Sequence, residues 1–124
     1  MTFYDEVGGY ATFERIVDGF YREVALDPVL RPMYPEEDLE PAAERFTMFL
    51  VQYWGGPTTY SERRGYRRLR MRHRAFKVNP EARDHWLAHM RAALDTLGLS
   101  PLHESTLWGY LESAAHSLVN THEP

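Results

Sequence analysis

The sequence predicts an all-helical protein, a single domain over residues 1–124 with about four long helices and a few short ones. Apolar residues recur at spacings of three and four along most of the chain, which is the period of an α-helix. Glycines and prolines stand where those runs stop, and no run alternates apolar and polar residues as a strand does. With 124 residues, of which 44% are hydrophobic, the chain can bury a core of its own.

The first long helix is predicted between Gly8-Gly9 and Asp27-Pro28. Its apolar stripe consists of Phe13, Ile16, Val17, Phe20, Tyr21 and Val24. Proline lacks the backbone N–H that a helix interior needs, so Pro28 closes this helix. Pro32 and Pro35 leave room only for a short helical turn before the next long helix.

The second long helix is predicted to end at residues 54–57, where the sequence is WGGP. Its stripe consists of Ala42, Phe46, Phe49, Leu50 and Tyr53. Residues 57–72 show no clean period, and we expect an extended loop there, of a length that is usually functional. A short helix carrying His73 and Phe76 is expected to follow the loop.

Two further helices begin at N-cap signals. Asn79-Pro80-Glu81 combines an N-cap, a proline in the first turn and an early acid, and the helix that follows is predicted to end at Gly98. Its apolar face consists of Trp86, Met90, Ala93, Leu94 and Leu97. Ser100-Pro101 repeats the signal, and the last helix is expected to fray after Asn120. Its apolar face consists of Leu107, Leu111, Ala114 and Leu118.

The composition argues against several classes of protein. The chain has no cysteine, which excludes disulfides, thiolate metal sites and a cysteine nucleophile, and favours the reducing cytoplasm. A formal net charge of −4 argues against general affinity for nucleic acid. The N-terminus does not resemble a signal peptide, and no run of about 18 apolar residues is present. We therefore expect a cytoplasmic protein with no membrane partner.

Charge is unevenly spread along the chain. Residues 63–77 hold seven arginines and one lysine without a carboxylate, whereas residues 36–44 are acidic. Either the two segments pair with each other or the basic segment binds something anionic. The pattern alone also fits a solvated basic face.

Among six histidines, His85 and His89 share one helix face because four residues separate them. The zinc-protease motif requires a glutamate directly after the first histidine, where this chain has Trp86, and the sequence marks no third ligand. The pair therefore indicates solvated or partly buried histidines more than a metal site. His116 is expected to bond a nearby carbonyl, and His103 and His122 to lie at the surface.

His73 stands among both apolar and cationic side chains. The apolar side chains are Leu69, Met71 and Phe76, and arginines stand between and around them in the sequence. A haem presents a large apolar ring, an iron that accepts a neutral imidazole and two charged propionates. One ligand would thus explain both features, although a histidine among arginines, taken alone, more often indicates a phosphate-binding or solvated loop.

Several motifs, taken in order, resemble the truncated haemoglobins, and most closely their second group, from Phe3 to Asn120. They are FYDEVGG (3–9), DGFYREV (18–24), MYPEEDL (33–39), MFLVQYWGGP (48–57), RLRMRH (68–73), DHWLAHM (84–90) and AAHSLVN (114–120). The resemblance implies a shortened globin fold, in which two pairs of antiparallel helices sandwich haem b.

The same resemblance implies roles for individual residues. His73 would be the proximal iron ligand, and Tyr21, Tyr34 and Trp86 would form a distal hydrogen-bonding cluster. The haem pocket would be lined by Ala42, Phe46, Phe49, Leu50, Met71 and Phe76. The propionates would be held by Arg45, Tyr60 and Arg72. On spacing alone, Tyr21, Phe46 and Trp86 are better explained as core residues.

The implied function is reversible binding of dioxygen and other small diatomic ligands. Phenol and indole donors would slow ligand release, which suits sensing, scavenging or redox chemistry better than bulk transport. One alternative is an enzyme, a haem peroxidase or nitric oxide dioxygenase served by a reductase. Another is a haem-free helical module that binds an anionic partner through its arginines. Those arginines exceed what two propionates neutralise, so some would face water, the acidic segment, a reductase or a second copy of the chain.

Overall fold

The computed structural model describes residues 2–35, 37–58 and 78–121. These residues form five α-helices and one 3-10 helix, and no strand occurs among them. The α-helices are α1 (Phe3–Glu6), α2 (Tyr10–Val24), α3 (Glu40–Tyr53), α6 (Pro80–Asp95) and α7 (Pro101–Ser117), and the 3-10 helix η1 spans Arg31–Met33. The predicted all-helical class is confirmed. No helix of this described part is long and apolar enough to cross a bilayer.

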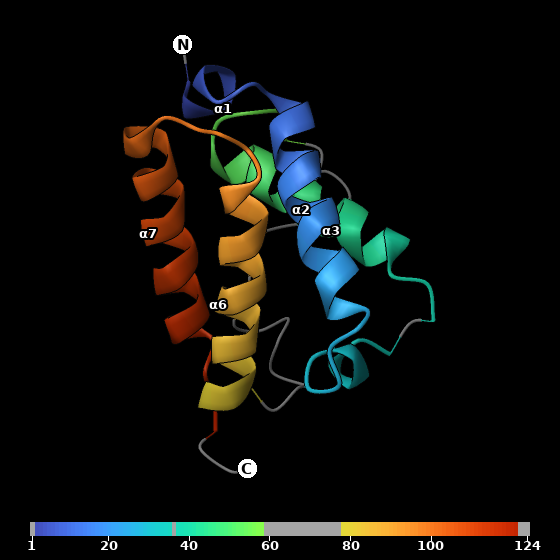
Figure 1. The fold of residues 1–124 in the computed structure, drawn as a ribbon. Helices are drawn as coiled ribbons and strands as arrows, with labels where there is room; N and C mark the ends of the chain where they lie inside the picture. The colour runs from blue at the N-terminus through green and yellow to red at the C-terminus, as the bar shows by residue number, and fades with distance from the viewer. Residues whose placement is uncertain (1, 36, 59–77, 122–124) are drawn as a thin grey trace.

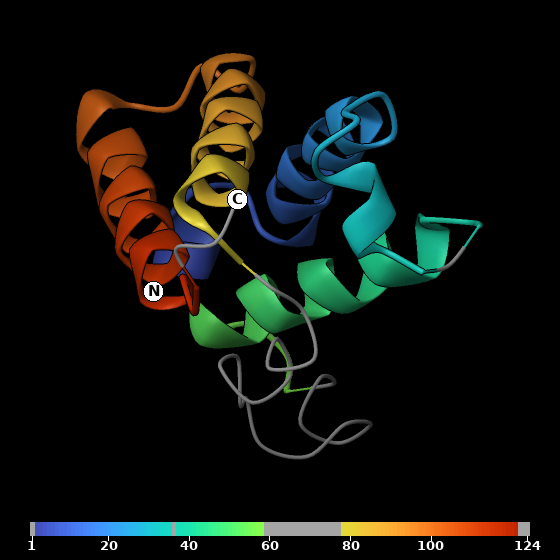
Figure 2. The same ribbon diagram turned by 90° about the horizontal axis from the view of Figure 1, so that it is seen from below.

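The four long helices form two layers. Figure 1 shows α6 and α7 side by side and antiparallel, with α2 along the other side of α6. Seen from below, α3 lies on one side of the layer formed by these helices and runs across it (Figure 2). Helix α2 packs on both α3 and α6, so it connects the two layers.

Helix α2 buries the stripe that its sequence predicts. All six predicted residues are buried, and Phe13, Ile16, Val17, Phe20 and Val24 have no exposed surface. The predicted N-caps are also confirmed: Ala82 N–H donates to Asn79 Oδ1 (2.8 Å), and His103 N–H donates to Ser100 Oγ (3.3 Å). The short turn expected between the prolines is η1.

Helix α3 differs from its prediction in the width of its buried face. Thr47, Met48 and Val51 are buried beside the predicted Ala42, Phe49 and Leu50. Tyr53 was expected on the buried stripe but is 42% exposed, and its ring stacks on Tyr110 of α7 (4.1 Å between centroids). A helix packed on more than one neighbour buries more than one stripe, which is why the simple stripe is too narrow.

The ends of α6 and α7 show smaller differences from prediction. Helix α6 stops at Asp95, and Gly98 follows with φ +64° in the left-handed region that favours glycine. In α7 the buried alanine is Ala115, whereas Ala114 is half-buried. The expected loop and short helix over 57–76 fall almost wholly outside the described residues; Pro57 and Thr58, which are described, are not helical.

The turn between α1 and α2 requires a glycine at position 8. Gly8 has φ +112°, and a Cβ there would lie 2.5 Å from Thr12 Oγ1. That hydroxyl donates to the Val7 carbonyl (2.7 Å), so it cannot move away without losing its hydrogen bond. We expect Gly8→Ala to lower the free energy of unfolding by about 1–3 kcal/mol, measured by urea denaturation.

Gly109 offers a matched control for this substitution. It lies inside α7, its backbone is helical, and nothing lies within 4 Å of the position that a Cβ would take. Gly109→Ala should raise stability by up to about 1 kcal/mol, because alanine is the better helix former. Equal effects of the two substitutions would contradict the assigned strain at Gly8.

Candidate functional site: an aromatic cluster and a buried aspartate

An aromatic cluster joins α2, α3, α6 and the segment after η1. The rings of Tyr21 and Tyr34 meet edge to face, with centroids 5.4 Å apart. Phe46 of α3 lies 6.3 Å from Tyr21 and 6.3 Å from Trp86 of α6. The structure therefore brings together the three residues predicted for the distal cluster and one predicted pocket residue, Phe46, from positions far apart in the sequence.

Phe20 stands at the centre of this cluster and was missed as a site residue. Its ring lies 5.1 Å from Tyr21, 5.3 Å from Trp86 and 6.0 Å from Phe46, and it has no exposed surface. The sequence shows it only as one member of the core stripe. The neighbouring Tyr21 indicated the right helix, but no local signal shows that Phe20 supports the rings around it.

The cluster combines apolar rings with three side chains that can donate a hydrogen bond. Tyr21 is buried, whereas Tyr34, Phe46 and Trp86 are half-buried, so part of each of these three surfaces is accessible. The phenol O–H groups and the indole N–H are donors, and the phenyl ring of Phe46 excludes water around them. This arrangement suits a large apolar ligand that carries a small polar acceptor.

The remaining predicted pocket residues of α3 lie in the core. Ala42 and Phe49 are each 5% exposed and Leu50 is 1% exposed. Arg45 lies on the same helix, directly before Phe46, and is half-buried. Their predicted contacts with haem remain predictions. The other predicted site residues, Tyr60, Met71, Arg72, His73 and Phe76, lie outside the described residues.

Hydrogen bonds join the residue before the N-cap of α6 to the segment that follows α7. Val78 N–H donates to Asn120 Oδ1 (2.8 Å), and Asn120 N–H donates back to the Val78 carbonyl (2.9 Å). Val78 is 8% exposed, and the bond from its N–H to Asn120 is partly buried. It anchors the residue that directly follows the segment containing His73.

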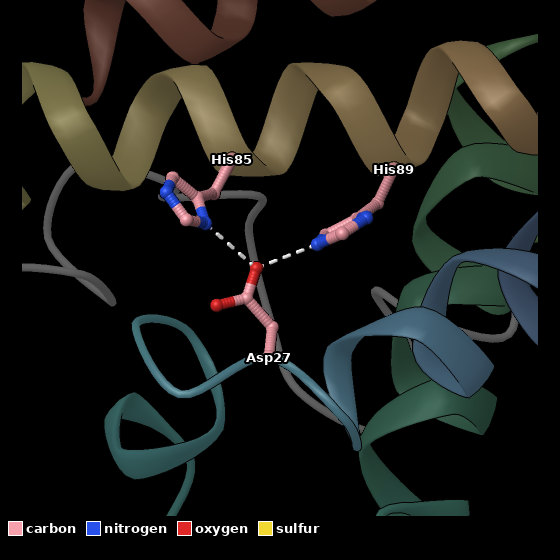
Figure 3. Close-up of side chains that lie close together, drawn as sticks. All are labelled: Asp27, His85 and His89. Carbon is pink, nitrogen blue, oxygen red and sulfur yellow. Dashed lines mark hydrogen bonds and ion pairs between the residues drawn. The ribbon is translucent and has the colours of Figure 1, made fainter.

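A second group of side chains lies where α2 turns toward η1. Figure 3 shows the Asp27 carboxylate between the rings of His85 and His89, which both point to it from α6. The Oδ2 oxygen lies 2.8 Å from His85 Nδ1 and 2.6 Å from His89 Nε2. The other oxygen, Oδ1, accepts from the backbone N–H groups of Val29 (2.7 Å) and Leu30 (3.2 Å).

Hydrogen bonding keeps Asp27 ionised although it is buried. Burial alone would raise the pKa of this carboxyl group. The bonds from His89, His85 and the two backbone N–H groups outweigh burial and hold the pKa well below its ordinary value. An anion is therefore fixed between α6 and the turn after α2. Asp27 was predicted only to close a helix, so its role in this cluster was missed.

Comparison with known proteins identifies the family to which the chain belongs. The chain belongs to the bacterial-like globins, whose family pattern matches residues 2–120. Within that family it is a truncated haemoglobin of the second group, as its motifs predict. It is 40% identical to group 2 truncated haemoglobin YjbI of Bacillus subtilis (strain 168), over 95% of this chain and 89% of that protein.

Solved structures agree with this assignment. A haemoglobin from the actinobacterium Thermobifida fusca is 61% identical, with a TM-score of 0.97 over 99% of this chain and 100% of that one. A truncated haemoglobin from Bacillus subtilis is 38% identical, with a TM-score of 0.90 over 97% of this chain and 100% of that one. The two-over-two helical sandwich expected from the motifs is confirmed.

Globins carry haem b, and the described residues fit that group. The cluster offers an apolar surface for the ring, and its O–H and N–H donors suit a polar ligand on one face. The chain is therefore a haem-binding globin. The anion-binding module without haem, which the arginines alone allowed, does not describe its family.

Proposed function

We propose that this globin binds dioxygen reversibly and releases it slowly, with His73 as the proximal ligand of the haem iron. The observation that carries the proposal is the convergence of Tyr21, Tyr34 and Trp86 around Phe46. When bound, haem supplies an iron that takes a diatomic ligand and makes the outer atom of that ligand a stronger hydrogen-bond acceptor. The name of the solved Bacillus subtilis relative calls it oxygen-avid, which supports the proposal for this chain.

The side chains of the cluster have separate tasks in this proposal. Tyr34 and Trp86 donate hydrogen bonds to the ligand, and Tyr21 either donates directly or orients Tyr34, whose ring it meets edge to face. Phe20 and Phe46 hold these rings and exclude water, which strengthens each bond. Ala42 is small and leaves room for ligand entry along α3. Arg45, Tyr60 and Arg72 would hold the propionates of bound haem.

Loss of the proximal histidine tests the proposal directly. We expect the purified protein to show an intense Soret absorption band, and His73→Gly to lose most of it because no imidazole remains for the iron. Imidazole added to the variant should restore the band by occupying the space left by the side chain. The measurement is a hemin titration followed by absorption.

His116→Gly serves as the control, because His116 is exposed in the last turn of α7. It removes a histidine without approaching the aromatic cluster and should keep the Soret band. A His73→Gly variant with an unchanged Soret band would exclude His73 as the proximal ligand.

A further inference from the structure

We propose that Asp27, His85 and His89 form a binding site for one divalent transition-metal ion of the zinc class, separate from haem. Their ligand atoms Asp27 Oδ2, His85 Nδ1 and His89 Nε2 all lie within 4.8 Å of one another. Both ring nitrogens point to the same carboxylate oxygen, as Figure 3 shows. Two imidazoles and a carboxylate are a ligand set that zinc takes in proteins.

The spacing of the two histidines prepares them for a common ligand. They stand four residues apart on α6, so their side chains project from the same face, one turn from each other. Asp27 reaches that face from the turn after α2, 58 and 62 residues away along the chain. The site therefore exists only in the folded protein, and an ion in it would tie α6 to this turn.

The distances are compatible with an inserted ion after a small movement. Ligands about 2.0–2.1 Å from a tetrahedral zinc ion lie about 3.3 Å from one another. The carboxylate oxygen and the ring nitrogens are now 2.8 and 2.6 Å apart, so each ring must withdraw by roughly half an ångström. The ring proton that now bridges each pair moves to the other ring nitrogen or leaves, and the freed lone pair binds the metal.

The surroundings of Asp27 supply the second shell that metal ligands need. Its Oδ1 accepts from Val29 and Leu30 N–H, which orients Oδ2 toward the histidines. The Asp27 side chain is 4% exposed, whereas the side chains of His85 and His89 are 38% and 21% exposed. An ion can therefore enter past His85 and keep a water as its fourth ligand.

The test uses haem-loaded protein without an affinity tag, dialysed against a chelator and then titrated with Zn²⁺ in a calorimeter. We expect one equivalent to bind. Asp27→Asn and His89→Gln should each weaken the affinity by about 100-fold or more, because loss of a direct ligand costs at least as much as loss of its orienting partner. The proposal does not depend on dioxygen binding, so either can fail alone.

His103→Gln is the matched control. His103 also faces a carboxylate, Glu6 Oε1 at 3.7 Å, but neither partner is buried, and this variant should keep the affinity of the parent. X-ray absorption at the zinc edge, which haem iron does not obscure, should show two imidazole ligands. Far-UV circular dichroism establishes that each variant is folded.

Two results would overturn the proposal. If the folded parent binds no zinc, the three side chains form a hydrogen-bonded clamp only. If Asp27→Asn and His89→Gln bind zinc as tightly as His103→Gln, the ion occupies an adventitious surface position. Should one of the two ligand variants fail to fold, the other decides the result.

Discussion

Replacing Trp86 with phenylalanine is expected to speed dissociation of dioxygen from the haem-loaded protein by about ten- to hundredfold. A hydrogen bond to a charged acceptor contributes about 1.5–3 kcal/mol, and a factor of ten corresponds to about 1.4 kcal/mol. Phenylalanine removes the indole N–H but keeps an aromatic ring against Phe20 and Phe46. The change should therefore appear in the dissociation rate more than in stability. Stopped-flow mixing of the oxygenated protein with dithionite and carbon monoxide measures this rate.

Tyr34→Phe should act in the same direction, because it removes one phenol O–H and keeps the ring beside Tyr21. Trp108→Phe is the control for Trp86. Trp108 is also half-buried, but it lies on α7 under the guanidinium group of Arg91, 5.0 Å from the ring centroid, outside the cluster. Unchanged dissociation rates in both Trp86→Phe and Tyr34→Phe would refute the proposed role of the cluster.

Local patterns predicted the helices well where one face of a helix meets the core. The stripe of α2 and the caps Asn79 and Ser100 depend on residues within one or two turns of each other, and all of them are confirmed. The prediction for Tyr53 was wrong: it is the last residue of α3, and it stacks on Tyr110 at the surface instead of entering the core. Spacing alone cannot tell how many neighbours a helix will have.

The sites show a different limit. Composition and spacing could not distinguish Tyr21, Phe46 and Trp86 from ordinary core residues. Only the ordered motifs of the family predicted that these three side chains meet. Asp27 had no such support, because its partners lie 58 and 62 residues away and Asp-Pro is an ordinary way to end a helix. The pair His85 and His89 was visible in the sequence, but its third member could be found only after folding.

Phe20→Ala should lower the free energy of unfolding by about 3–5 kcal/mol, more than any variant described above. The ring has no exposed surface and touches Tyr21, Phe46 and Trp86, so its removal leaves a cavity that these bulky rings cannot fill without moving. The free energy of unfolding of a native domain is about 5–15 kcal/mol, so this loss would be a large share of it. Chemical denaturation of the haem-loaded variant measures it.

Phe13→Ala separates this structural effect from the effect on ligand binding. Phe13 lies on the same helix, is equally buried, and stacks on Tyr4 of α1 (6.0 Å between centroids) instead of on the cluster. Both variants should lose similar stability, but only Phe20→Ala should change the dissociation rate of dioxygen, because only Phe20 supports Trp86 and Tyr21. If both variants altered that rate equally, the donors would be positioned by the core as a whole and Phe20 would have no particular role in the site.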